Sequence, residues 1–384
     1  MLKKLVVLVL AVTMLFSLAG CKTYADNFKL LGVDYETSEN VFLNVGETIE
    51  IDFLELFTNY VPNIKKVDAA SSDERIFTIS GNRIKAVGMG SASLMTTVYD
   101  EDTRTKQTVA AVKVYVVNPS KMIEVKTAQD LVDISKNMEG AYILKSDIDL
   151  EGNGDWLPIA KYSAEGNLIA YFGGIFINPD GHKIKSLTIN SAKKPILKDD
   201  GIYELEFLGL FASVAFAYID GLILENVSID TSAYTDDAYQ YLIAGGICGQ
   251  SYNSVIRNCT VDGVIVSQFA AGGIAGKLYK GFIIGCNFKG AVENTSGIQS
   301  GGAGGIAGNG IPAPRIIDCT VEAEISGKLC AGGILGHFID TLSNYDKITD
   351  YIKGCSFTGE LNAQYTGKNV GLIGFSFENK GGLN

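Results

Sequence analysis

Six short segments of the chain repeat one order of apolar and polar side chains. In each of them the fourth and sixth residues are apolar and the fifth is polar, which is the period-two alternation of a β-strand with one buried face. The segments are 184–189, 224–229, 256–261, 283–288, 316–321 and 352–357. Their fourth position holds Leu187, Val227, Cys259, Cys286, Cys319 and Cys355. We therefore expect this column of side chains to point inward in stacked strands.

The residue that precedes this column is always of a type that tolerates a left-handed backbone. Glycine has no Cβ to clash, and short polar side chains bond to nearby backbone groups in turns. The six residues are Ser186, Asn226, Asn258, Gly285, Asp318 and Gly354. We expect the chain to bend at this position, between two short strands of each repeat.

A second phrase, Gly-Gly-Ile-x-Gly, recurs alongside these segments. It stands at 245–249, 272–276, 304–308 and 332–336, and weaker versions occur at 172–176, 209–211 and 371–374. A spacing of roughly 27 to 38 residues is typical of repeats that bury their apolar side only by stacking on their neighbours. One repeat provides enough chain for one coil of a parallel β-helix. The repetition therefore favours a structural role for these glycines over a nucleotide-binding loop.

The repeated phrases resemble the GLUG motif family over residues 121–384, and the segments 127–131, 146–150 and 156–159 look like the lead-in that such arrays carry. Members of that family are mostly bacterial surface proteins, including adhesins and non-catalytic parts of secreted peptidases. We expect a right-handed parallel β-helix whose residues 121–160 form an N-terminal cap. Within the cap, Thr127 and Asp130 predict the start of a short amphipathic helix.

Residues 30–118 show short alternating runs separated by turn signals, as an all-β sandwich requires. A tight turn is expected at Gly81-Asn82 and a longer hairpin across Asp100–Asp102. The phrases at 43–48, 71–73 and 84–92 resemble the bacterial immunoglobulin-like group 2 family, although Ala70 stands where that family often has an aromatic residue. The resemblance implies an immunoglobulin-like spacer. The polar stretch at 117–120 predicts the boundary with the repeats.

The first twenty residues have the order of segments that is typical of a secretory signal. Lys3 and Lys4 precede an apolar run from Leu5 to Phe16, and Leu18-Ala19-Gly20-Cys21 follows it. This arrangement resembles a bacterial lipoprotein signal, which implies a lipid on Cys21 and a tether over residues 21–29. The alternatives are an ordinary secretory peptide or a membrane anchor, but the apolar run is shorter than the roughly 20 residues of a span. We expect the protein in the cell envelope, lipid-anchored and facing outside the cytoplasm.

The chain carries a net negative charge. Without residues 1–20, 30 basic side chains remain against 43 acidic ones, which leaves a formal charge of −13. Such a body lacks the basic face that nucleic acid or anionic lipid requires. The expected partners are the membrane, through the N-terminal lipid, and an extracellular glycan or protein ligand, with no nucleic acid.

No metal or cofactor site is expected from the residue types and their spacing. Four of the cysteines fall in one inward column, and a line of sulfurs cannot surround a tetrahedral ion, so we interpret them as buried free thiols rather than disulfides. His182 and His337 have no metal-binding partner at a suitable spacing. The segment 147–155 resembles a calcium loop but has Pro158 where a glutamate is needed, which favours turn-forming roles for Asp147 and Asp149.

The sequence predicts a non-catalytic adhesin or binding module on a spacer. The competing hypothesis is a carbohydrate-active β-helix enzyme, either a polysaccharide lyase or a glycoside hydrolase. In that case Asp230 and Asp262, aligned in one outward column, are the expected carboxylate pair.

Four tyrosines around the insertion 230–243 are candidate ligand-facing residues, with packing of the loop onto the coil as the alternative. They are Tyr234, Tyr239, Tyr241 and Tyr252. The insertions 230–243, 293–303 and 338–350 are the expected places for function, since they interrupt the regular spacing.

Overall fold

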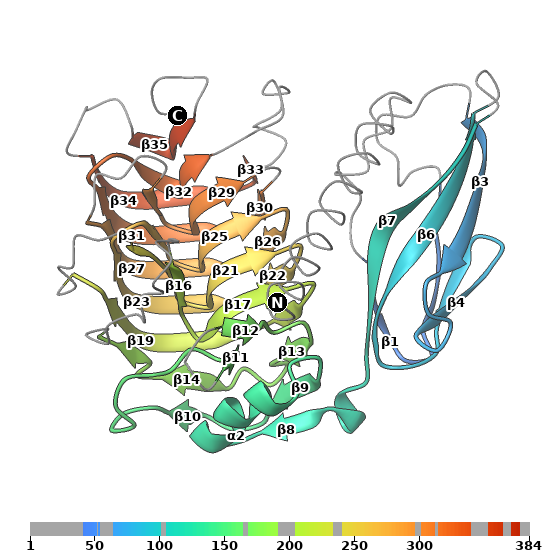
Figure 1. The fold of residues 1–384 in the computed structure, drawn as a ribbon, viewed down its shortest axis with the longest axis horizontal. Coiled ribbons are helices and arrows are strands. Elements are labelled where there is room, and N and C mark those ends of the chain that lie inside the picture. The colour runs from blue at the N-terminus through green and yellow to red at the C-terminus, as the bar shows by residue number, and fades with distance from the viewer. Residues whose placement is uncertain are drawn as a thin grey trace, which may run out of the picture. The chain divides into compact units, whose positions relative to one another are not determined.

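The structure is a computed structural model that describes residues 41–51, 53, 64–100, 105–163, 168–190, 204–232, 240–295, 301–311, 314–338, 352–363 and 370–376. The chain divides into two compact units, residues 1–121 and 122–384. Most of the described residues lie in strands (Figure 1). Within the described ranges, no helix is long and apolar enough to span a membrane. The lipidation prediction for Cys21 lies outside the described residues.

The first unit contains two β-sheets that share one apolar core. One sheet has the order β1 (Val41–Asn44), β7 (Thr105–Val117), β6 (Gly90–Asp100) and β3 (Ile64–Ser71), and the other has β2 (Thr48–Glu50), β5 (Arg83–Ala86) and β4 (Phe77–Ser80). Leu43, Leu94 and Val114 from the first sheet cluster with Phe77 and Ile84 from the second. The hairpins predicted at Gly81-Asn82 and after Asp100 are confirmed by the antiparallel pairs β4–β5 and β6–β7.

The second unit begins with a cap made of η2 (Pro119–Lys121), β8 (Ile123–Val125), α2 (Ala128–Asp133), η3 (Ile134–Lys136) and β9 (Ala141–Leu144). The predicted helix start is confirmed. The Thr127 side chain accepts a hydrogen bond from the Asp130 N–H, and the Asp130 carboxylate accepts one from the Thr127 N–H. Leu131 and Ile134 are fully buried on the core of the second unit. The antiparallel pair β11 (Lys161–Tyr162) and β12 (Leu168–Ala170) follows the cap.

Three parallel sheets wrap around this core in a β-helix-like arrangement (Figure 1). Sheet I comprises β8, β9, β13 (Ile175–Ile177), β18 (Tyr218–Asp220), β22 (Val255–Arg257), β26 (Phe282–Ile284), β30 (Arg315–Ile317) and β33 (Ile352–Lys353). Sheet II comprises β10 (Ile148–Asp149), β14 (Lys183–Lys185), β15 (Thr188–Ile189), β19 (Ile223–Asp230), β23 (Thr260–Ser267), β27 (Asn287–Asn294), β31 (Thr320–Gly327) and β34 (Ser356–Ala363).

Sheet III is folded into two arms, which meet at the Gly-Gly-Ile phrases. One arm contains β16 (Glu204–Leu208), β20 (Gln240–Gly245), β24 (Ala270–Gly272) and β28 (Gly302–Gly304). The other contains β17 (Phe211–Ala215), β21 (Cys248–Tyr252), β25 (Ala275–Tyr279) and β29 (Ala307–Ile311), and β32 (Ala331–Phe338) runs through both and pairs with β35 (Val370–Ser376).

The first glycine of each phrase is required by the closeness of the two arms. A Cβ on Gly272 or on Gly304 would lie 2.0 Å from the carbonyl oxygen of Ala275 or Ala307, respectively. Real Cβ atoms do not approach backbone oxygens so closely, so only glycine fits. The isoleucine that follows the second glycine is fully buried in each phrase, as Ile306 shows. The phrase therefore forms a sharp, tightly packed corner of the coil.

The left-handed bends are confirmed, but the alignment of the first two segments is wrong. All six residues of the bend column have φ between 52° and 62°. In the structure, however, Leu224 pairs with Val261, five positions beyond Ile256, and Ile229 pairs with Ile265. A β-bulge between Leu224 and Val227 separates these coils from the later ones. Segments 184–189 and 224–229 therefore lie within sheet II, whereas the cysteine-containing segments span the corner between sheets I and II.

Candidate functional site

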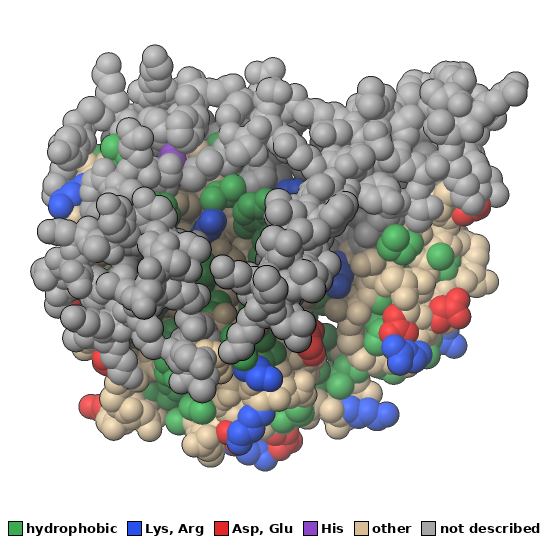
Figure 2. Space-filling model, viewed as in Figure 1, with side chains coloured by type: hydrophobic (Ala, Val, Ile, Leu, Met, Phe, Trp, Pro, Cys, Tyr) green, Lys and Arg blue, Asp and Glu red, His purple; other side chains and the backbone are tan. Residues whose placement is uncertain are grey.

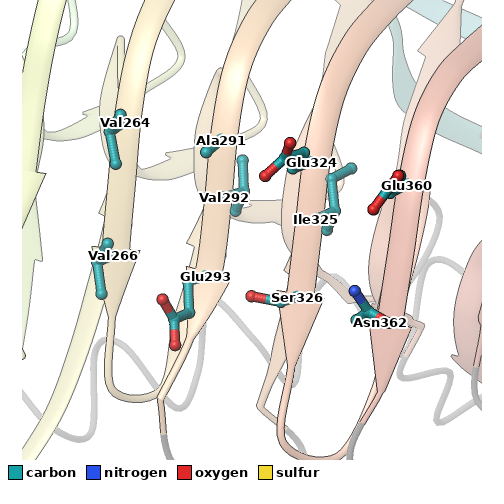
Figure 3. A pocket seen from close by; sticks show the side chains of 10 residues that line it. All are labelled: Val264, Val266, Ala291, Val292, Glu293, Glu324, Ile325, Ser326, Glu360 and Asn362. Atoms are coloured by element: carbon teal, nitrogen blue, oxygen red, sulfur yellow. The ribbon is translucent and has the colours of Figure 1, made fainter.

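The outer face of sheet II holds an open pocket with a volume of about 230 Å³ (Figure 3). It crosses the four strands β23, β27, β31 and β34. The lining residues are Val264, Val266, Ala291, Val292, Glu293, Glu324, Ile325, Ser326, Glu360 and Asn362. The pocket thus draws on residues almost 100 positions apart in the sequence, which the stacking of coils brings together.

Strand alternation explains the mixed chemistry of this pocket. Ile265, Val292 and Ile325 point into the core, so the residues on either side of each point outward. Val264 is exposed to 47% of its surface, and in register with it Ala291, Glu324 and Glu360 follow on successive strands. The site combines an apolar end on β23 with carboxylates, a hydroxyl and an amide on the other strands.

The pocket has the groups of a binding surface. Glu293, Glu324 and Glu360 are all exposed, and the lining contains neither a histidine nor a cysteine. Across the described residues, no group of three or more His, Cys, Asp and Glu side chains is arranged to hold a metal ion. Acceptor groups beside an apolar end suit a ligand that offers hydroxyl or ammonium donors.

The carboxylate pair expected for an enzyme is not formed. Asp230 pairs with Val266, whereas Asp262 pairs with Lys289. Because segment 224–229 pairs several positions further along β23 than the sequence alignment implied, Asp230 lies beside a residue four positions beyond Asp262. The Asp230–Asp262 prediction is therefore wrong. The adjacent carboxylates of sheet II are instead Glu324 and Glu360, which are in register on β31 and β34.

The candidate tyrosines divide into two groups. Tyr234 and Tyr239 lie outside the described residues. Tyr241 and Tyr252 lie in strands β20 and β21, and both are half-buried. The Tyr241 ring packs edge-on against Phe269, with centroids 4.6 Å apart. These two tyrosines are thus anchored on the coil.

Tyr252 belongs to an aromatic ladder on the outer face of sheet III. Its ring stacks on that of Tyr279, its in-register partner on β25, with centroids 4.9 Å apart and an interplanar angle of 15°. On the other side, Phe216 meets Tyr252 edge-on at 5.5 Å and is 40% exposed. The ladder Phe216–Tyr252–Tyr279 was not apparent from the sequence, because its members are 27 and 36 residues apart.

A polar column runs beside this ladder on the same face of sheet III. Two residues before each tyrosine, Gln250 and Lys277 are paired in register, and Asn309 and His337 continue the column on β29 and β32. Gln250 and Lys277 are half-buried, whereas Asn309 and His337 are fully buried. His337, which directly follows the glycine-rich segment 332–336, thus lies in strand β32.

The cysteine column is packed as the sequence predicted for its last four members. The N–H groups of Cys259 and Cys286 each donate to the Sγ of the next cysteine at 3.4 Å. Burial raises the pKa of the Cys286 and Cys248 thiols, and it raises the pKa of Cys330 to about 12. These thiols are free in the structure, and they fill the interior as small apolar groups.

The aspartates of the cap segment 147–155 accept hydrogen bonds from the backbone or lie close to neighbouring cations. Asp147 accepts the N–H of Lys183 at 3.0 Å, and its carboxylate lies 3.5 Å from the Lys185 Nζ and 3.6 Å from His182 Nδ1. These contacts, led by the backbone hydrogen bond, lower the pKa of Asp147. Asp149 accepts the N–H of Glu151, as a turn-forming aspartate does.

Charges of both signs are interspersed on the visible part of the described surface around the cap (Figure 2). Lys145 contacts Asp180 at 2.7 Å, Lys183 contacts Glu225 at 2.7 Å, and Lys136 contacts Asp133 at 2.8 Å. These exposed pairs contribute little to stability. Each of these lysines therefore already has a carboxylate of the protein as its counter-ion.

Comparison with known proteins supports one part of the sequence interpretation. The model of the GLUG motif family matches residues 241–266, which correspond to one coil from β20 to β23. No curated protein matches the chain. Among solved structures, a crystal structure of a "putative immunoglobulin A1 protease" from Bacteroides ovatus is similar, with 17% sequence identity and a TM-score of 0.39 over 66% of this chain and 85% of that one. The chain therefore carries a GLUG motif within a β-helix-like array of parallel strands.

Proposed function

We propose that this protein is a lipid-anchored bacterial surface protein that binds an extracellular ligand without catalysing a reaction. Its first unit acts as an immunoglobulin-like spacer, and its second unit is a right-handed β-helix that presents the binding faces. The handedness follows from the strong preference of parallel crossover connections. The GLUG motif at residues 241–266 and the β-helix-like fold are consistent with a surface role.

The observation that carries the proposal is the pocket on sheet II. Its lining is made of hydroxyl, amide, carboxylate and valine side chains on rigid, in-register strands. Binding sites on strands keep their geometry without ordering a loop, which lowers the entropy lost on association. A glycan is the favoured ligand, because its hydroxyl groups match these acceptors.

The ligand prediction is tested by exposing the purified mature protein to arrays of glycans and extracellular proteins. We expect selective binding of glycans, and a decrease in that binding when Ser326 and Asn362 are both replaced with alanine. The Ser356→Ala variant, on the same strand as Asn362 but outside the pocket, is the matched control. Absence of binding to every glycan and protein in the arrays would contradict the proposal.

The anchor prediction is tested at Cys21. We expect the wild-type protein, expressed in a bacterium supplied with radiolabelled palmitate, to carry the label and to sediment with membranes. The Cys21→Ser variant should lose both properties, because the lipid is attached through sulfur. A matched Cys248→Ser variant should keep them. Membrane association that survives Cys21→Ser would indicate a membrane anchor other than the lipid.

A polysaccharide-degrading enzyme is the second candidate, and the adjacent Glu324 and Glu360 are the observation that favours it. Glycosidases place two carboxyl groups about 5 to 10 Å apart, and strands in register are about 4.8 Å apart. Both side chains are exposed, whereas a general acid usually owes its proton to burial. Release of reducing ends from acidic polysaccharides, abolished by Glu324→Gln, would favour the enzyme.

A further inference from the structure

Lys277 differs from the paired lysines of the second unit. Lys145, Lys183 and Lys289 each contact a carboxylate at 2.7 to 3.3 Å. Lys277 forms neither an ion pair nor a hydrogen bond with any residue in the described ranges. Within the described ranges, Lys277 is thus a half-buried cation that contacts no carboxylate.

The surroundings of this ammonium are partly dehydrated. Lys277 is half-buried on β25, and burial lowers its pKa because the charged form loses hydration. A partly dehydrated charge interacts more strongly with an incoming opposite charge than a fully hydrated one. The side chain is thus better suited to bind an anion than an exposed surface lysine is.

The neighbours of Lys277 are neutral groups that can hydrogen-bond. Gln250 is its in-register partner on β21, one strand spacing of about 4.8 Å away. Tyr279 follows two residues later on the same face, and its ring is held by the stack with Tyr252. An amide and two phenols beside one ammonium can bind hydroxyl groups around a carboxylate.

We propose that Lys277, Gln250 and the Tyr252–Tyr279 pair form a binding site for a carboxylate-bearing saccharide, such as a uronic-acid oligomer. The ammonium pairs with the sugar carboxylate, while Gln250 and the phenol groups bind ring hydroxyls. This inference rests on the proposed glycan-binding function and assigns it a second site, on sheet III, with a defined charge preference. The rigid aromatic stack keeps the site in place between ligand-binding events.

The test is calorimetric titration of the full-length mature protein with hexagalacturonate, and with cellohexaose as the neutral hexasaccharide. We expect hexagalacturonate to bind more tightly than cellohexaose. Its affinity should decrease as salt is added, because salt screens the ion pair. The Lys277→Met variant should lose about tenfold or more in affinity for hexagalacturonate, as expected for a hydrogen bond to a charged group. Lys289→Met, which removes the same charge from β27 in sheet II, should bind like the wild type.

A second variant keeps the Lys277 side chain and the volume at position 250 but gives the ammonium a counter-ion within the protein. Gln250→Glu places a carboxylate beside Lys277, so it should reduce hexagalacturonate affinity without unfolding the coil. Unchanged affinity in both Lys277→Met and Gln250→Glu would overturn the site while leaving glycan binding elsewhere intact. Equal affinity of the wild type for the acidic and neutral hexasaccharides would overturn it too. If the arrays also show no glycan bound at all, the proposed function fails together with the site.

Discussion

Replacing Gly304 with alanine is expected to destabilise the second unit by about 3 kcal/mol, at the upper end of what overpacking usually costs. The new Cβ would lie 2.0 Å from the Ala307 carbonyl oxygen and 2.5 Å from the Gly336 backbone nitrogen. Both contacts are with backbone atoms on fully buried corners, so no side-chain rotation relieves them. β28 must therefore move away from both β29 and β32 before the methyl group fits.

Urea denaturation followed by tryptophan fluorescence measures this effect in the intact protein. Trp156 is the only tryptophan, and it is buried in the second unit, so its signal reports that unit selectively. Gly181→Ala is the matched control, because a Cβ at Gly181 meets no atom within 4 Å and only its φ of 73° opposes alanine. We expect a loss of about 1 kcal/mol there. Equal losses at the two glycines would show that the clash does not determine the requirement for Gly304.

Local sequence signals predicted the local structure of the repeats well. The bend column was identified from residue type alone, and each of its members has a left-handed backbone. The capping box at Thr127 and Asp130 likewise required only residues close in sequence. Such features depend on interactions within a few residues, which a single sequence contains.

Relations between coils were harder to predict. Segment 224–229 fits the same apolar pattern as segment 256–261, yet the two lie at different places on the coil. The apolar pattern of a segment does not say which part of the coil it occupies, so the displacement of Leu224 by five positions and of Ile229 by four was not detectable from it. The same misalignment caused the wrong prediction for Asp230. When a segment is displaced along the coil, a different residue of the next strand becomes its neighbour, and Asp230 therefore lies beside Val266 rather than Asp262.

The candidate sites were not predictable from the sequence for the same reason. The pocket on sheet II requires the register of β23, β27, β31 and β34 together. Lys277 looks like an ordinary surface lysine after Gly276 until its in-register neighbours are known. The burial of Lys277 and its lack of a contacting carboxylate among the described residues depend on how the coils stack, and no short motif encodes them.

Phe211→Ala is expected to destabilise the second unit by about 3 to 5 kcal/mol, the usual range for truncating a buried phenylalanine. The Phe211 side chain is fully buried where the cap meets the first complete coil. Its ring stacks on Phe172 with centroids 4.8 Å apart and meets Phe176 edge-on at 6.2 Å. Alanine would leave a cavity that the neighbouring strand β21 cannot close, because parallel hydrogen bonds hold it against β17.

Phe216→Ala provides the comparison, since Phe216 is five residues away and 40% exposed. Its loss removes one edge-on contact with Tyr252 and should lower the free energy of unfolding by less than about 1 kcal/mol. The same Trp156 fluorescence signal measures both variants, and Phe211→Leu should recover most of the stability because it restores most of the buried volume. A loss at Phe211 no larger than that at Phe216 would mean that the aromatic cluster does not join the cap to the coils. In that case the N-terminal end of the β-helix would depend for its stability on its other contacts, such as the strand pairs β9–β13 and β10–β14.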